Sequence, residues 1–140
     1  MFIDQDLVFS DDQAITATGR STEIVNLGTR TKWGISDIVT VKVQVTKAFT
    51  NAGSLVAQIR RWKETDGTDS AGSNQNLSFS NANLGTAGFE QSFDIPADWD
   101  VASLDINYVV TGTIASGTIT AWIDTKKLGY VAVEAGAAIA

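Results

Sequence analysis

The chain has 140 residues, 44% of them hydrophobic and 19% charged, with a formal net charge of −6 and a sequence pI of about 4.4. It contains no histidine and no cysteine, which excludes Ser-His-Asp and Cys-His catalysis and the usual zinc sites. The acidic balance argues against nucleic-acid binding and against docking on anionic membranes.

The N-terminal stretch begins with apolar side chains beside acidic ones. Phe2 and Ile3 stand next to Asp4 and Asp6. The stretch lacks the basic and apolar regions of a signal peptide, so we expect cytoplasmic synthesis. We predict an arm-like segment over about residues 1–9 that packs on its own domain or on a neighbouring subunit.

Period-two alternation predicts strands in the first half of the chain. The clearest is at residues 37–46, where four valines alternate with polar residues. A second strand is predicted at residues 55–62, and a weaker pattern favours one at residues 22–27.

The middle of the chain is rich in turn-forming residues. Residues 64–87 carry many Gly, Ser, Asn and Asp side chains and are predicted to form a loop excursion with a short strand at 77–79. A strand at residues 88–95 would end at Pro96, the only proline, which cannot donate to a sheet.

Two further strands are predicted at residues 103–111 and 118–125. In the first, Leu104, Ile106 and Tyr108 face one way, and the polar residues between them face the other. The short link between the two strands, residues 112–117, contains two glycines. A strand, a glycine turn and a strand are typical of a hairpin.

The C-terminal stretch, residues 128–140, is small and apolar. Leu128, Tyr130, Val131 and Val133 would be poorly solvated if they were free. We therefore predict a second arm-like segment there, which either closes its own sandwich or lies on a neighbour.

Short strands with turns between them, and no helical periodicity, predict the fold class. We expect an all-β chain that forms an antiparallel two-sheet β-sandwich of jelly-roll type. The length predicts a single domain over residues 1–140, with the two arm-like segments at its ends.

Two tryptophans are predicted to point outward from their strands. Trp122 alternates with Ala121 and Ile123, and Trp62 lies beside Arg60 in a short basic run that could meet an acidic partner surface. We favour a protein interface, because aromatic residues are enriched in interface cores. The alternative is a sugar-stacking platform built from the four tryptophans of the chain.

Aspartates occur in local pairs, at positions 4 and 6, 11 and 12, 66 and 69, and 98 and 100. Paired carboxylates can hydrolyse glycosides when the fold sets their separation. Asp side chains also bond nearby main-chain N–H groups in turns, which explains the pairs more simply. We therefore expect no catalytic, metal-binding or cofactor-binding residues.

Five segments share a pattern of strands and turns: LVFSDDQAITAT at 7–18, IVNLG at 24–28, FDIP at 93–96, LDINY at 104–108 and ASGTITAW at 115–122. Together they resemble the small capsid cement, or decoration, proteins of tailed phages, of the type that coats a short-tailed Bordetella phage. The resemblance leaves out the 64–87 excursion and the extreme C-terminus.

This resemblance implies a non-enzymatic jelly-roll protein of the virion, made in the host cytoplasm, that dimerises on the outer capsid surface and bridges subunits of the major capsid protein. The alternatives are a carbohydrate-binding jelly-roll module, a tail or baseplate structural protein, and a glycoside hydrolase. The side chains predicted to make the contacts are Phe2, Ile3, Arg60, Trp62, Trp122, Leu128, Tyr130, Val131 and Val133.

Overall fold

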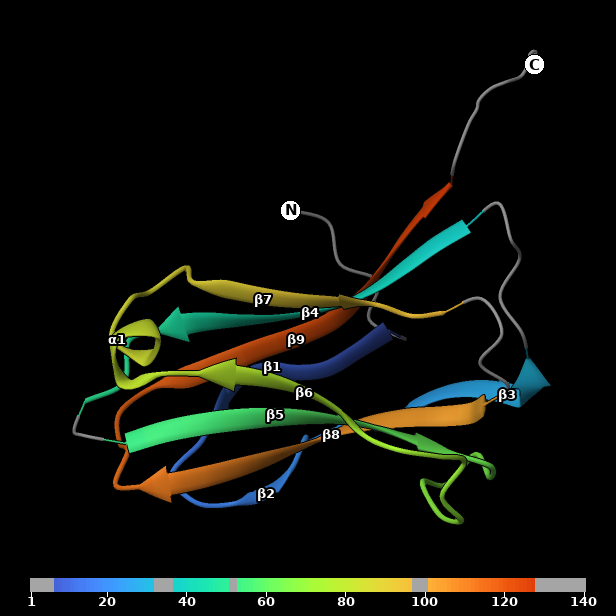
Figure 1. Cartoon of the computed structure of the whole chain (residues 1–140), viewed down its shortest axis with the longest axis horizontal. Helices are drawn as coiled ribbons and strands as arrows, with labels where there is room; N and C mark the ends of the chain where they lie inside the picture. Colours follow the sequence, from blue (N-terminus) through green and yellow to red (C-terminus); the bar gives the residue numbers. More distant parts are fainter. Residues whose placement is uncertain (1–6, 32–36, 51–52, 97–100, 128–140) are drawn as a thin grey trace.

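The computed structural model describes residues 7–31, 37–50, 53–96 and 101–127 as two β-sheets packed face to face (Figure 1). The elements of these residues are β1 (Val8–Ala14), β2 (Gly19–Arg20), β3 (Val25–Thr31), β4 (Asp37–Lys47), β5 (Gly53–Trp62), β6 (Gln75–Phe79), α1 (Asn81–Leu84), β7 (Glu90–Asp94), β8 (Val101–Gly112) and β9 (Thr118–Lys127). The predicted all-β class is confirmed.

The strand order is that of a jelly roll. The first sheet has the order β1-β9-β4-β7, and the second has the order β2-β8-β5-β6, with β3 also paired to β8. All these pairs are antiparallel. When β2 and β3 count as one position, four strands face four strands, as in an eight-stranded jelly roll. The predicted two-sheet sandwich is confirmed.

The alternating apolar residues form the core between the sheets. The four valines of β4 from Val39 to Val45 are at most 1% exposed, and Leu104, Ile106 and Tyr108 of β8 are fully buried. Both predicted sets therefore face the core, because side chains of a strand alternate between its two faces.

The predicted hairpin between residues 103 and 125 is wrong. β8 belongs to the second sheet and β9 to the first, so residues 113–117 cross from one sheet to the other. A Cβ on Gly117 would overlap the ring of Phe49, and Ala115 pairs with Thr50 across this end of the sandwich. Alternation specifies which face of a strand is buried, but not which strand is its neighbour.

The 64–87 excursion contains more structure than a loop. The strand predicted at 77–79 is present as the longer β6. Ser80 then caps α1 by accepting a bond from the Asn83 N–H, and the Asn83 side chain accepts one from the Ser80 N–H. Among the described residues, no helix has the length and apolar character needed to cross a membrane.

β1 was not predicted as a strand. Phe9 is fully buried in the core, so the last residues of the predicted N-terminal arm belong to the sandwich. The pairing of β1 with β9 is interrupted by register shifts, and Asp12 has a positive φ of 48°. Such irregularities break the period-two pattern by which a strand is found.

One polar pair lies inside the sandwich. The hydroxyl groups of Tyr108 and Ser10 share a hydrogen bond of 2.8 Å between β8 and β1. Burial raises the pKa of the Tyr108 phenol well above its usual range, and the hydrogen bond to Ser10 offsets a part of this rise. The phenol is therefore held in its neutral form.

Candidate interaction surface

The outer face of the second sheet carries a compact polar cluster. Across the β5–β8 pair, Arg60 is directly opposite Asp105, and Trp62 is directly opposite Ser103. Their neighbours Ile59 and Leu104 lie in the core. Alternation therefore turns Arg60, Trp62 and Asp105 to the outside of the sandwich.

Asp105 is the centre of this cluster. The Arg60 Nε and Nη2 atoms donate to its two carboxylate oxygens at 2.8 and 2.7 Å, and Arg20 Nε lies 2.6 Å from Oδ2. The Asp105 side chain is fully buried, whereas those of Arg60 and Arg20 are 20% and 43% exposed. The carboxylate is thus fully paired, as a buried charge requires. The cluster ties β2, β5 and β8 together.

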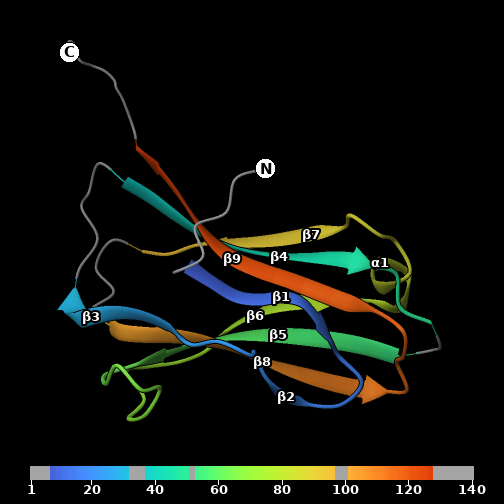
Figure 2. The ribbon, with the colours of Figure 1, turned by 180° about the vertical axis from the view of Figure 1, so that it is seen from behind.

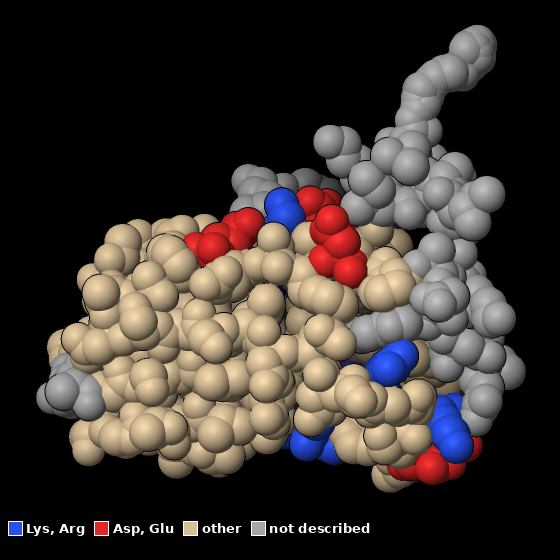
Figure 3. Space-filling view, in the orientation of Figure 1, with Lys and Arg blue, Asp and Glu red and all other residues tan. Residues whose placement is uncertain are grey.

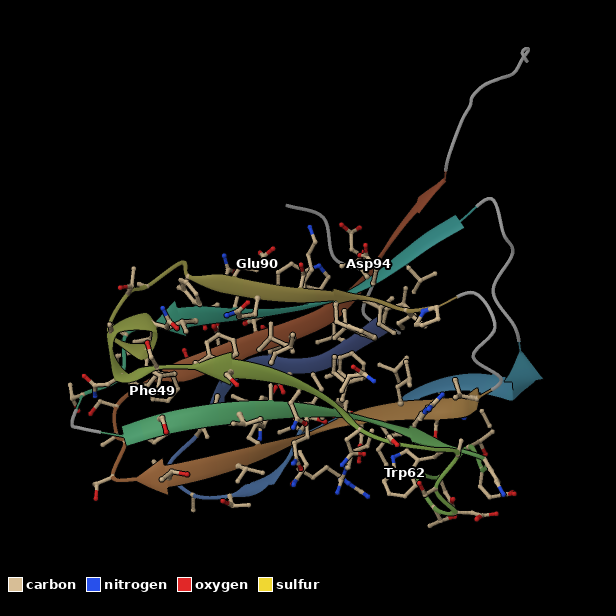
Figure 4. The ribbon with its side chains drawn as sticks, viewed as in Figure 1. Phe49, Trp62, Glu90 and Asp94 are labelled. Carbon is tan, nitrogen blue, oxygen red and sulfur yellow. The ribbon has the colours of Figure 1, made fainter. Side chains whose placement is uncertain are left out.

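Trp62 is half-buried at the end of this cluster. The guanidinium carbon of Arg60 lies 5.2 Å from the centre of its ring, which is within the range of a cation–π contact. Trp62 pairs with Ser70 of the following loop, and Figure 4 shows its side chain beside that loop. Ser103 Oγ donates to the Glu64 carbonyl at 2.6 Å and holds the same loop on the sheet.

The outer face of the first sheet contains the other predicted aromatic residue. Trp122 lies between Val8 and Lys42 in the register, and it points away from the core to which Ala121 and Ile123 contribute. The predicted outward direction is therefore correct. Trp122 is nevertheless only 2% exposed, so in the single chain it offers almost no area to a partner.

Charged side chains on this first-sheet face are more exposed. Lys42 Nζ lies 3.2 Å from the Asp124 carboxylate and 4.0 Å from that of Glu90. Thr40 Oγ1 donates to Asp94 at 2.7 Å. Glu90, Asp94 and Asp124 are all exposed residues. In Figure 3, red atoms gather along the upper side of the molecule, where β7 lies. The described part of this face near β7 therefore carries the exposed carboxylates Glu90, Asp94 and Asp124 around Lys42.

Comparison with known protein families identifies the family of the chain. The Bbp16 family model matches residues 9–123, from Phe9 in β1 to Ile123 in β9. The chain belongs to the Bbp16 family. The name points to a family of Bordetella phage proteins. This agrees with the phage group to which the sequence showed a resemblance. No curated protein matches the chain.

The Bbp16 match includes only three of the predicted contact residues. Arg60 and Trp62 lie together on the second sheet, and Trp122 lies on the outer face of the first sheet. The two described tryptophans therefore do not form one platform. The other predicted contacts lie outside the described residues, as do Trp33 and Trp99: Phe2, Ile3, Leu128, Tyr130, Val131 and Val133.

One member of each described aspartate pair in this Bbp16-family chain makes a structural hydrogen bond. Asp12 bonds Thr120 through both its main-chain N–H and its carboxylate, and Asp66 accepts a bond from Thr68 Oγ1. No group of three or more carboxylates that could hold a metal ion gathers within the described residues.

Two residues of the cluster, Arg20 and Asp105, were missed by sequence reasoning. Asp105 was read only as a polar position of an alternating strand, and Arg20 stands 85 positions before it. A buried carboxylate between two arginines joins strands that are distant in sequence. One sign was present: Asp105 lies in the middle of a long strand, where aspartate is depleted.

Proposed function

We propose that this protein is a non-enzymatic structural component of a phage virion that binds the outer surface of an icosahedral capsid and cements neighbouring major capsid subunits. The observation that supports this most is the Bbp16 match, which runs from the first strand of the sandwich to the last. In this proposal the protein acts as a homodimer, and its surface binds other proteins and catalyses no reaction.

The geometry gives this proposal a physical basis. A decoration protein needs a rigid body with more than one contact surface, and the two outer faces of the sandwich differ in chemistry. On the second sheet, the charges of Arg20, Arg60 and Asp105 satisfy one another. On the first sheet, Glu90 and Asp94 are exposed. We assign the first-sheet face to the contact with the shell, where it would meet basic side chains.

The mechanism of cementing is mass action. A protein that binds the assembled shell, but not separate subunits, stabilises the shell by the free energy of binding. Many copies on one shell add avidity, so that each single contact can be modest. The protein itself does not have to change shape.

The first experiment compares capsids with and without the bound protein. We expect decorated capsids to open at a higher temperature and to survive a larger osmotic shock. Equal stability of the two preparations would contradict the cementing role. Localisation by electron microscopy on whole virions separates it from a tail or baseplate protein, and glycan binding by the isolated chain would favour the carbohydrate-binding alternative.

A pair of charge reversals tests the assigned face. Glu90→Lys with Asp94→Lys places two positive charges on the first-sheet face, and we expect capsid occupancy to fall at least tenfold. The matched control, Glu23→Lys with Glu64→Lys, changes the net charge equally but at two exposed positions away from that face. Equal loss by both variants would reject the assigned face and leave the cementing role to the first experiment.

A further inference from the structure

The two open sides of the sandwich are closed differently. On the side of β1, the Glu23 N–H donates to the Phe9 carbonyl at 2.9 Å, so the two sheets are joined through the main chain. Figure 2 shows this side from behind, with β1, β2 and β3 in front. On the opposite side lie the edge strands β6 and β7. There the links run through side chains: Gln91 Nε2 donates to the Ser78 carbonyl at 3.1 Å, and the rings of Phe79 and Phe89 meet edge to face with their centres 5.9 Å apart.

The outer edge of β6 presents main-chain groups that do not bond β5. The Ser21 N–H donates to the Ile106 carbonyl, so the main-chain N–H and C=O groups of Ile106 point toward β2. The main-chain groups of the odd-numbered residues of β8 therefore point toward β5. Gln58 of β5 is opposite Asn107, so its main-chain groups bond β8, and those of the next residue, Ala57, point toward β6. Ala57 is opposite Leu77, so the main-chain groups of Leu77 bond β5. Those of Asn76 and Ser78 therefore point outward, as the bond from Gln91 to the Ser78 carbonyl confirms.

This edge lacks the charges, prolines and bulges by which natural edge strands avoid pairing. Its sequence, Gln-Asn-Leu-Ser-Phe, contains no charge and no proline, and it pairs with β5 over its full length without a register shift. By contrast, β7 carries Glu90 and Asp94, and β1 has register shifts and a positive φ at Asp12. Proteins use charges, bulges and irregularities to keep an edge from pairing with other chains. An edge without them is suited to pairing.

We propose that two copies of this chain pair through β6, antiparallel about Leu77, so that the second sheets of the two copies become continuous. This proposal rests on the proposed function, in which the protein acts as a dimer. Asn76 then lies opposite the partner's Ser78, and the two residues exchange reciprocal main-chain hydrogen bonds. The Ser78 carbonyl keeps its bond to Gln91, because a carbonyl oxygen accepts two.

Charge permits a second copy to pair with β6 and disfavours such pairing at β7. Around a two-fold axis at Leu77, no charged side chain of β6 meets another. The same pairing of β7 about Ser92 would place Glu90 opposite the partner's Asp94, and like charges directly opposite each other destabilise a sheet. Of the two strands on this side, only β6 can pair with itself without repulsion.

The first test measures self-association of the full chain by sedimentation over a range of concentrations. Ser78→Pro removes an outward N–H and places a ring on the edge, without affecting the bonds to β5. We expect the dimer dissociation constant to rise at least tenfold. The matched control is Ser92→Pro on β7, whose main-chain groups also point outward because Phe89 and Ile95 bond β4. This control should leave the dimer unchanged, and circular dichroism checks that both variants fold.

The second test uses charge to recognise the register. Copies with Asn76→Lys and Ser78→Lys, and copies with Asn76→Asp and Ser78→Asp, should each be monomeric. An equal mixture should form heterodimers, because each lysine then faces an aspartate of the partner. Dimers of the lysine variant alone, at the wild-type dissociation constant, would overturn the assignment of this edge.

The outcomes separate this inference from the proposed function. One outcome is that the wild-type protein is monomeric at every concentration and that the wild-type and lysine-variant proteins stabilise capsids equally. This outcome would overturn pairing through β6 and leave the cementing role intact. A β6 dimer that does not stabilise capsids would do the reverse. A monomer whose capsid binding is lost with Ser78→Pro would show that this edge receives a strand of another protein, which also overturns pairing with a second copy.

Discussion

The outer faces of the two sheets each carry a group of charged side chains, and the two groups are built in opposite ways. On the second sheet, Asp105 is fully buried and bonded by Arg60 and Arg20 at distances of 2.6 to 2.8 Å. On the first sheet, Asp124 is 49% exposed and lies 3.2 Å from the partly exposed Lys42.

This difference separates the charges that stabilise the fold from those that can bind a partner. A buried carboxylate depends on its partners, because no water replaces them. An exposed ion pair contributes little to stability, since water and salt compete with it. The charge on the second sheet is therefore structural, and that on the first sheet is available for binding.

The largest expected effect separates the two carboxylates directly. We expect Asp105→Ala to lower the free energy of unfolding by about 3 kcal/mol, because it leaves two guanidinium groups without their shared partner. We expect Asp124→Ala to lower it by less than about 0.5 kcal/mol. Urea unfolding followed by tryptophan fluorescence measures both. A loss of the same size in the two variants would remove the distinction between the faces.

The two arginines of the second sheet are expected to contribute differently to stability. Arg60 makes two bonds to Asp105 and lies over Trp62, whereas Arg20 makes one close contact to Asp105 and is 43% exposed. We expect Arg60→Ala to cost about 2 kcal/mol and Arg20→Ala about 1 kcal/mol of stability. An Arg20 variant as unstable as the Arg60 variant would mean that exposure does not weaken this ion pair.

Alternation in the sequence was enough to predict the faces of the strands. Val39 to Val45 and Leu104 to Tyr108 enter the core as the period-two pattern requires. It did not predict the partners of the strands, because β8 and β9 are consecutive in the chain but belong to opposite sheets. Neighbours in a jelly roll are set by how the whole chain folds over, and local patterns do not contain that information.

The polar clusters were beyond the reach of sequence reasoning for a similar reason. Asp105 and Arg20 become partners only after β2 has paired with β8. A buried aspartate and an exposed one have the same letter in the sequence. Trp122 shows the same limit in reverse, since its outward direction was predicted from Ala121 and Ile123 but its burial was not.

A modest loss of stability at neutral pH is expected when the polar pair between the sheets is broken. Tyr108→Phe removes the 2.8 Å hydrogen bond to Ser10, and we expect a loss of about 1 kcal/mol. The pair is neutral, so its burial needs no counter-ion, unlike that of Asp105. Its distinguishing mark is a dependence on alkaline pH.

The sign of that dependence follows from the raised pKa of Tyr108. In the unfolded chain, a tyrosine loses its proton near pH 10, whereas the folded protein keeps the proton at higher pH. The stabilisation is therefore complete below pH 10 and is lost as pH rises above it, by up to about 1.4 kcal/mol per pH unit from this group. Urea unfolding of wild-type protein and of Tyr108→Phe at pH 9, 10 and 11 isolates this contribution, because all other titrating groups are shared. The two proteins should converge in stability as pH rises, and a constant difference between them would show that the phenol titrates freely in the folded state.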